Sequence, residues 1–115
     1  MTTTIYHNPR CSKSRQTLTL LEENNIKPVI IEYLNTPPDA ATLTGILEQL
    51  QMNAQELIRT GEDEYKQAKD EIAGMDESTL VTWMTRNPKV IQRPIVLTNK
   101  CACIGRPPEC VLEIL

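Results

Sequence analysis

The chain has 115 residues and a formal net charge of −3, and 40% of its residues are hydrophobic but only 3% aromatic. This length fits a single domain with one core, built mostly from Leu, Ile and Val because phenylalanine is absent. The acidic balance and the few aromatic side chains argue against a nucleic-acid-binding surface. No stretch is long and apolar enough to span a membrane.

The first expected elements are a strand, a helix and a second strand. Residues 3–6 have the character of a short strand. Residues 12–24 have the spacing of a helix, with Leu18 and Leu21 on one face. The apolar run at residues 29–33 predicts the second strand, which follows a proline.

A helical block is expected next, over roughly residues 36–88. Thr36 is a suitable cap for its first helix, because Pro37 then takes the first helical position and Asp39 the third. The apolar residues that follow recur at helical spacing.

Two further helices are expected inside this block. Residues 53–56 repeat a cap-like pattern and open a short helix, which leads to Arg59 just before a glycine. Residues 76–79 start another long helix, and Asn87-Pro88 ends it.

The last part of the chain predicts two strands and a helix. Residues 94–98 and 101–104 form the strands, which a turn around Asn99-Lys100 joins as a hairpin, and a terminal helix covers roughly residues 108–114. The complete order is β-α-β, a helical block, then β-β-α. This is a thioredoxin-like α/β arrangement, so residues 1–115 are expected to form one domain with a helical insertion.

Cys11 is the leading candidate for a reactive residue, because it lies between the first strand and the first helix. The thiol is therefore at or next to a helix N-terminus and is flanked by Arg10, Lys13 and Arg15. Unpaired backbone N–H groups, the helix dipole and nearby cations stabilise a thiolate there. The same groups suit an incoming oxyanion. The alternative is a small buried cysteine, which the polar and basic neighbours make the weaker interpretation.

The neighbours of Cys11 can support this chemistry. His7, the sole histidine, can stabilise the thiolate or relay a proton, or it can be a hydrogen-bonded structural residue. Ser14 can donate a hydrogen bond to sulfur or to an anion. Arg15 lies one helical turn after Cys11, although a solvated helix residue is an equal alternative.

Two familiar cysteine motifs are absent from this loop. A C-x-x-C redox pair needs a cysteine at the position of Ser14, and a phosphatase-type loop needs an arginine at the position of Thr17. Cys11 therefore has no local resolving partner, and a second thiol for redox work must come from elsewhere.

Three arginines outside the loop are candidates for binding an oxyanion. Arg93 precedes Pro94 at the start of a strand, where thioredoxin-like folds place a cis proline facing the reactive cysteine. Arg106 follows the last strand, and Arg59 follows the short helix of the insertion. Together they would bind a tetrahedral anion through charge-assisted hydrogen bonds, whereas each alone could be a surface residue.

The remaining cysteines are Cys101, Cys103 and Cys110. Their spacing matches no zinc motif, so we expect no metal. Cys101 and Cys103 share one strand face and can simply pack there. A thiol pair could also hold trivalent arsenic or form a regulatory disulfide.

On these residues the chain resembles the glutaredoxin-linked arsenate reductase family, over nearly its whole length and in the right order. The segments that carry the resemblance are residues 7–15 (HNPRCSKSR), 32–34 with Pro37-Pro38, 57–59 (LIR), 93–96 (RPIV) and 105–107 (GRP). The Ser12-Lys13 pair after Cys11 resembles the YfgD-like housekeeping subgroup, whereas typical resistance enzymes carry Gly-Thr there.

The resemblance implies reduction of arsenate to arsenite in a thioredoxin-like core with a helical insertion. It implies that Cys11 is the nucleophile, that Arg59, Arg93 and Arg106 bind the oxyanion, and that His7, Ser14 and Arg15 support the thiolate. Cys11 attacks arsenate, glutathione attacks next, glutaredoxin supplies reducing equivalents, and arsenite leaves. The scheme needs no metal or tightly bound cofactor.

Two other functions stay open at this point. One is a different glutathione-linked thiol oxidoreductase, which would keep the site and change the substrate. The other is an Spx-type redox-responsive transcriptional regulator, which shares the fold and binds RNA polymerase. Such regulators typically carry C-x-x-C at Cys11, and Ser14 argues against that switch. Residues 1–4 lack the features of a signal peptide, so we expect a cytoplasmic monomer.

Overall fold

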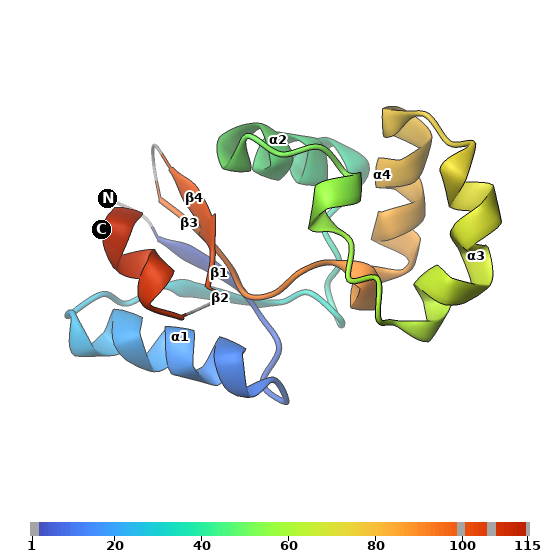
Figure 1. Ribbon diagram of the computed structural model, residues 1–115. Helices are drawn as coiled ribbons and strands as arrows, with labels where there is room; N and C mark the ends of the chain where they lie inside the picture. The colour runs from blue at the N-terminus through green and yellow to red at the C-terminus, as the bar shows by residue number, and fades with distance from the viewer. Residues whose placement is uncertain (1–2, 99–100, 106–107, 115) are drawn as a thin grey trace. The chain divides into compact units, whose positions relative to one another are not determined.

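The computed structural model describes residues 3–98, 101–105 and 108–114. The chain forms two compact units, which are described separately (Figure 1). The sheet unit comprises Met1–Thr36 and Arg93–Leu115, and the helical unit comprises Pro37–Gln92. The helical unit thus takes the place of the expected insertion. That residues 1–115 act as one domain stays a prediction.

The sheet unit contains a four-stranded sheet in the order β2-β1-β3-β4. β1 pairs with β2 in parallel, and the β1–β3 and β3–β4 pairs are antiparallel. This confirms the thioredoxin-like β-α-β and β-β-α order, including the hairpin of the last two strands. Its expected turn at Asn99-Lys100 lies outside the described residues. The elements are β1 (Thr4–His7), α1 (Ser12–Glu23), β2 (Val29–Glu32), β3 (Ile95–Leu97), β4 (Ala102–Ile104) and the 3-10 helix η3 (Pro108–Ile114).

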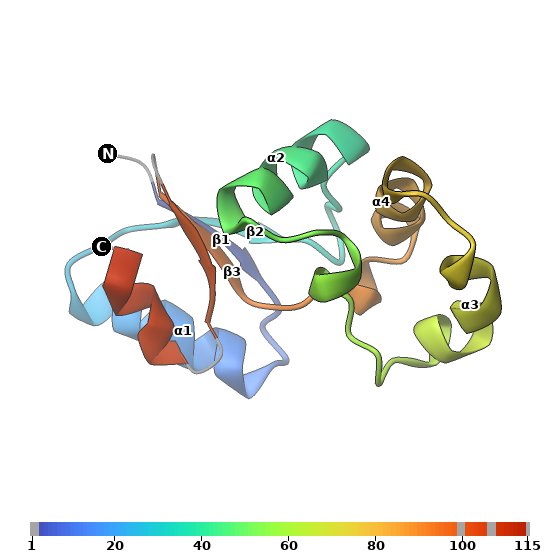
Figure 2. The same cartoon turned by 45° about the horizontal axis from the view of Figure 1, so that its top comes forward.

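One face of this sheet is covered by α1 and η3 (Figure 2). Alternate residues of a strand point to opposite faces, so Ile5 of β1 and Val96 of β3 both reach this side. They pack with Leu21 of α1 and Val111 of η3 in a cluster that is essentially inaccessible to solvent. Cys103 of β4 packs against the same cluster. The core therefore fastens α1, and with it the loop that carries Cys11, to the sheet.

The end of β4 is held against α1 and the start of β3 at Gly105. Its N–H donates to the carbonyl oxygen of Pro94 at 2.9 Å. A Cβ at Gly105 would lie 2.9 Å from Cγ of Pro94, closer than real Cβ atoms approach, and a tight 3.0 Å from Cγ2 of Thr17. Only glycine fits this junction. The Arg93–Pro94 peptide bond is cis, as expected for this fold.

The helical unit packs short helices around its own apolar residues. α2 contacts α4, and η2 contacts both α3 and α4. The elements are α2 (Ala40–Leu50), the 3-10 helix η1 (Gln55–Leu57), α3 (Asp63–Ala73), α4 (Glu77–Arg86) and the 3-10 helix η2 (Pro88–Val90). The side chains buried within it include Leu43, Ile46, Leu47, Leu57, Leu80, Val81, Met84 and Val90.

The helical unit corrects the sequence interpretation at the start of α2. Asp39, and not Thr36, is the cap, and its carboxylate accepts the N–H of Thr42 at 2.7 Å. A residue before a proline is driven out of the helical region, so Pro37 cannot be the first helical residue when Pro38 follows.

The helix α3 was not expected from the sequence. Ile72 is its one buried residue, so the apolar periodicity that reveals a helix is weak there. The cap-like pattern before η1 is confirmed, because Asn53 and Glu56 each accept the other's backbone N–H at 3.0 Å. Among the described residues, no helix is long and apolar enough to cross a membrane.

Candidate functional site

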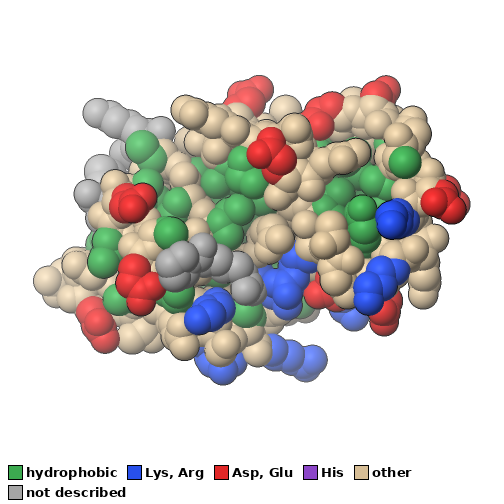
Figure 3. Space-filling view, in the orientation of Figure 1, with side chains coloured by type: hydrophobic (Ala, Val, Ile, Leu, Met, Phe, Trp, Pro, Cys, Tyr) green, Lys and Arg blue, Asp and Glu red, His purple; other side chains and the backbone are tan. Residues whose placement is uncertain are grey.

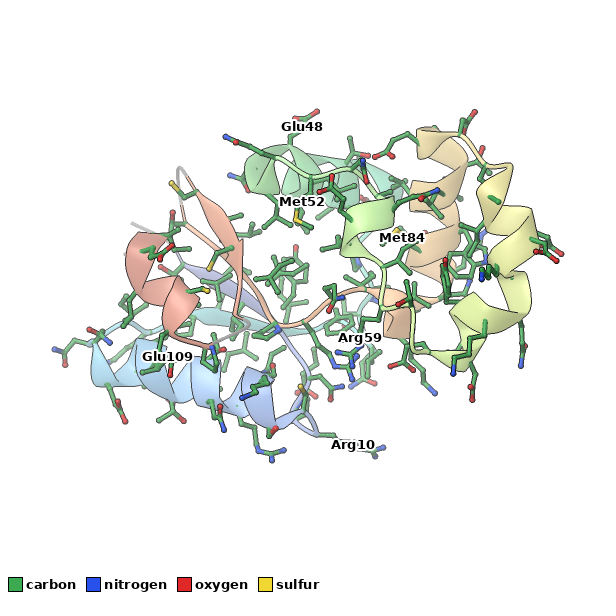
Figure 4. All side chains as sticks on the ribbon, viewed as in Figure 1. Arg10, Glu48, Met52, Arg59, Met84 and Glu109 are labelled. Atoms are coloured by element: carbon green, nitrogen blue, oxygen red, sulfur yellow. The ribbon has the colours of Figure 1, made fainter. Side chains whose placement is uncertain are left out.

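The loop before Cys11 is a tight turn that its own hydrogen bonds hold. The N–H of Cys11 donates to the carbonyl oxygen of Asn8 at 3.0 Å, and Asn8 Oδ1 accepts the N–H of Arg10 at 3.0 Å. Pro9 restricts the backbone between them. The side chain of Arg10 projects from this turn, away from the sheet (Figure 4). Asn8 was not a sequence candidate, although an Asn-Pro pair is a known turn signal.

Cys11 is the N-cap residue of α1, in an extended conformation (φ −93°, ψ 123°), and it is half-buried. Its carbonyl oxygen accepts the first intrahelical bond, from the N–H of Arg15 at 3.0 Å. The N–H groups of residues 12–14 precede that bond and have no acceptor within the helix. They therefore lie at the N-terminus of α1 beside the thiol, where they carry the positive partial charge of the helix dipole. An anion or a thiolate is stabilised at this position.

The charged side chains of α1 add to this positive potential. The first turn has no acidic residue and the last turn has no basic one. Arg10, Lys13 and Arg15 surround the N-terminus, and Glu22 and Glu23 occupy the C-terminal end. Figure 3 shows basic side chains gathered over the N-terminal half of α1. This arrangement opposes the preference of the helix dipole, and it favours negative charge at Cys11.

Ser14 and His7 form a buried pair behind the turn. Ser14 has no exposed surface and His7 is 6% exposed, and Ser14 Oγ lies 2.6 Å from His7 Nδ1. Ser14 Oγ also accepts the N–H of Asn8 at 3.0 Å. The hydroxyl has one donor and two acceptor sites, so its contact with Nδ1 is compatible with either tautomer of a neutral imidazole.

Burial lowers the pKa of His7, and the nearby Arg15 lowers it further, whereas Glu32 raises it. The ring is therefore neutral at neutral pH. In this state His7 positions Ser14 and the turn by hydrogen bonding. Support of the Cys11 thiolate by His7 and Ser14 stays a prediction.

Arg15 is attached to the turn. Its Nη1 donates to the carbonyl oxygen of Pro9 at 2.8 Å, so the side chain folds back from α1 onto the loop before Cys11. The charge is therefore held beside the thiol loop on an exposed surface. A groove of about 400 Å³ adjoins it, and this groove is lined by Ser12, Arg15, Gln16, Thr19, Leu20, Pro108 and Glu109.

Three arginines were expected to bind an oxyanion. Among the described residues of the sheet unit, Arg93 is the one of the three that is present. β1 and β3 pair antiparallel with Tyr6 opposite Ile95, so the residues just before β3 lie at the same end of the sheet as the loop that follows β1. The half-buried Arg93 therefore starts from backbone next to the Cys11 turn. Its binding of an oxyanion stays a prediction.

The other two expected arginines are not among the described residues of the sheet unit. Arg59 belongs to the helical unit, where it follows η1 (Figure 4). Its N–H donates to the carbonyl oxygen of Val90 at 2.6 Å, and its Nε lies 3.4 Å from Glu62 Oε1. The backbone of Arg59 is thus fixed against the segment that precedes Arg93 in sequence. Arg106 lies outside the described residues.

None of the four cysteines, all of which the structure describes, is in a disulfide. Within residues 3–98, 101–105 and 108–114, no group of three His, Cys, Asp or Glu side chains could hold a metal ion. The groups described at this site are a thiol, helix N–H groups and cations. Such a set can attack an electrophilic centre that carries negative oxygens.

Comparison with known proteins agrees with this arrangement. The model of the ArsC family matches residues 6–114. The chain is 54% identical to "uncharacterized protein YfgD" of Escherichia coli K12, over 96% of this chain and 94% of that one. It is 40% identical to an arsenate reductase of Neisseria meningitidis serogroup A, over 96% of each. The structure of an arsenate reductase from Vibrio cholerae superposes with a TM-score of 0.95 at 45% identity, covering 100% of this chain and 98% of that one.

Proposed function

Because the chain belongs to the ArsC family, whose pattern covers residues 6–114, we propose that it reduces arsenate to arsenite, with glutathione as co-substrate and glutaredoxin as reductant. The proposal requires no tightly bound cofactor, and it assumes a cytoplasmic monomer. It assigns Cys11 as nucleophile, Arg59, Arg93 and Arg106 as oxyanion ligands, and His7, Ser14 and Arg15 as supports of the thiolate.

The observation that carries the proposal is the position of Cys11 as the cap of α1. The thiol is half-buried, adjoins the N–H groups of residues 12–14, and has Arg15 fixed across its turn. An arsenate oxygen at this helix end would accept those N–H groups while sulfur faces arsenic. The nucleophile and the N–H groups at this helix end are thus already side by side.

The reaction begins with two condensations at arsenic. The Cys11 thiolate attacks bound arsenate, a sulfur–arsenic bond forms, and one arsenate oxygen leaves as water. The positive groups at the end of α1 stabilise the charge on the remaining oxygens. Glutathione then attacks the adduct in the same way, and a second water leaves.

Reduction and release follow. A glutaredoxin thiolate attacks the glutathione sulfur, and the glutathione–arsenic bond breaks with its electron pair left on arsenic. Arsenic thereby passes from the pentavalent to the trivalent state, and glutaredoxin departs as a mixed disulfide with glutathione. Water then hydrolyses the bond between Cys11 and arsenic, which frees arsenite and the thiol.

The groove beside Arg15 suits the approach of glutathione. It has a cation at the Cys11 end, and Glu109 also lines it. Glutathione carries carboxylates and an ammonium group, so both charges have a complementary partner there. Its thiol could then reach the adduct from the groove.

The test is arsenate-dependent NADPH oxidation coupled through glutathione reductase, with glutathione and glutaredoxin present. Wild type is expected to turn over, and Cys11→Ser is expected to show no turnover because the nucleophile is lost. Cys101→Ser removes an exposed thiol outside the site and should match wild type. Leaving out glutathione or glutaredoxin should also stop the reaction.

The two alternatives predict other outcomes. A different glutathione-linked thiol oxidoreductase would reduce mixed disulfides through Cys11 and leave arsenate unchanged. An Spx-type regulator would show no turnover and would co-purify with RNA polymerase. Arsenate turnover that survives Cys11→Ser would contradict the proposal itself.

A further inference from the structure

Two thiols outside the proposed active site lie on neighbouring elements of the sheet unit. Cys103 is in β4, Cys110 is in η3, and these two elements pack against each other. Both thiols are half-buried and neither is in a disulfide.

The geometry of η3 explains why these thiols face the same space. Residues three apart nearly eclipse each other in a 3-10 helix. Val111 and Ile114 therefore form one stripe, which packs on the core cluster together with Cys103. Cys110 and Glu113 form the adjoining stripe, and both act electrostatically on Cys103.

We infer that Cys103 and Cys110 form a dithiol site for trivalent arsenicals. When an arsenical with an As=O group binds, two sulfur–arsenic bonds form and the oxygen leaves as water with both thiol protons. Neither sulfur nor arsenic changes oxidation state. Arsenite, the product of the proposed function, is one such trivalent arsenical, and its supply to this site rests on that function. The binding itself needs no turnover.

The surroundings favour this ligand over the other ligands of a thiol pair. A structural zinc ion needs about four ligands, and no group of three candidate ligands exists among the described residues. Burial, with Cys110 and Glu113 nearby, raises the pKa of Cys103 to about 11, which disfavours attack by the Cys103 thiol on a disulfide. Condensation with an arsenical starts from protonated thiols, because both thiol protons leave with the arsenical oxygen as water.

The test uses phenylarsine oxide with a Cys11→Ser/Cys101→Ser variant, so that Cys103 and Cys110 are the two thiols left. Intact-mass measurement should show one arsenical bound and both thiols lost to a thiol reagent. A dithiol competitor should release the arsenical, whereas a monothiol at the same concentration should not. Adding Cys110→Ser should weaken binding about 100-fold or more, because the chelate is lost. Equal binding by this single-thiol variant would overturn the inference.

A second measurement needs no change in the buried residues. Phenylarsine oxide is added to the wild-type chain, which is then alkylated, digested and analysed by mass spectrometry. Cys103 and Cys110 should be protected together, with the same dependence on arsenical concentration. Protection of neither or of one alone, or a Cys103–Cys110 disulfide in place of the adduct, would overturn the inference. Because neither experiment measures turnover, failure of the proposed function would appear separately, in the NADPH assay.

Discussion

The helices α1 and α4 use opposite charge arrangements at their ends. α4 is capped by Asp76, which accepts the N–H of Thr79 at 2.7 Å, and has Glu77 in its first turn and Arg86 in its last. Each of these three side chains has the sign of charge that the helix dipole favours at its end of α4. α1 is capped by Cys11 and has no acidic residue in its first turn and no basic residue in its last. α4 is therefore arranged for stability, whereas α1 is arranged to hold negative charge at its cap.

The sheet unit must offset the cost of this arrangement by packing. A charge at the unfavourable end of a helix costs about 0.3–1 kcal/mol. Leu21 of α1 is fully buried in the core cluster, and burial of a leucine contributes roughly 1.5–3 kcal/mol. Thr17, one turn earlier on the same face of α1, contacts Gly105. The reactive cap therefore depends on tertiary contacts that α1 makes further along.

The largest expected effect comes from disturbing one of those contacts. In Gly105→Ala the new methyl group meets Pro94 and Thr17, so the free energy of unfolding should fall by roughly 1–3 kcal/mol. Denaturant unfolding measures it. The matched control in the helical unit is Gly45→Ala, because nothing lies within 4 Å of its added Cβ and α2 should gain about 0.5–1 kcal/mol. A neutral Gly105→Ala would mean that the junction does not hold α1.

The second-largest expected effect is on α4, the helix that Asp76 caps. Asp76→Ala leaves the N–H of Thr79 without its acceptor, and should lower Tm by roughly 4 °C. Asp76→Asn keeps an acceptor oxygen and should retain most of the stability. Bonds from Thr79 hold the pKa of Asp76 below its ordinary 3.8, so the advantage of wild type over Asp76→Ala is complete above that pH. It should disappear as the pH falls through the lowered value, and calorimetry at several pH values checks both points.

Charge-changing substitutions at the N-terminus of α1 and the C-terminus of α4 test the contrast between these two helices. Lys13→Glu places an acid in the first turn of α1, and should stabilise the chain by about 0.5 kcal/mol while raising the KM for arsenate a few-fold. Arg86→Glu in the last turn of α4 should destabilise by a similar amount and leave KM unchanged. If Lys13→Glu changes neither stability nor KM, the charge at the end of α1 has no functional role.

The smallest expected effect is a dependence of stability on pH through His7. Its pKa is lowered in the folded chain, so the unfolded chain binds more protons between the folded pKa and about 6.5. Its contribution is complete above about pH 6.5 and is lost as the pH falls through the folded pKa. The loss of stability between pH 7.5 and 5.5 should be smaller in His7→Gln, which has no titrating ring. Equal pH dependence in the two chains would mean that His7 is not buried as a neutral ring.

Much of the sheet unit could be predicted from sequence because its signals are local. Short apolar runs with flanking prolines identify β2 and β3, and the amphipathic residues 12–24 identify α1. The helical unit was harder. The start of α2 depends on the steric effect of Pro38 on Pro37, and α3 buries only Ile72. A helix that buries a single residue has little apolar pattern to reveal it.

At the candidate site, the place of Cys11 at the start of a helix was predictable, and the hydrogen bonds around it were not. The position of Cys11 between a predicted strand and a predicted helix already indicates a thiol at a helix N-terminus. The bond of Arg15 to the Pro9 carbonyl and the Ser14–His7 pair are contacts between residues six and seven apart, across a turn whose path no periodicity predicts. The close approach at Gly105 joins residues 88 apart in sequence, which single-sequence patterns cannot show.

The most direct test of the contrast between α1 and α4 is to measure stability and turnover together in Cys11→Ser. Serine is a better helix cap than cysteine, so the free energy of unfolding should rise by about 0.5–1 kcal/mol while arsenate-dependent NADPH oxidation disappears. That result would show that the cap of α1 serves chemistry at the expense of stability. A Cys11→Ser chain that is less stable than wild type, or that still reduces arsenate, would contradict the account.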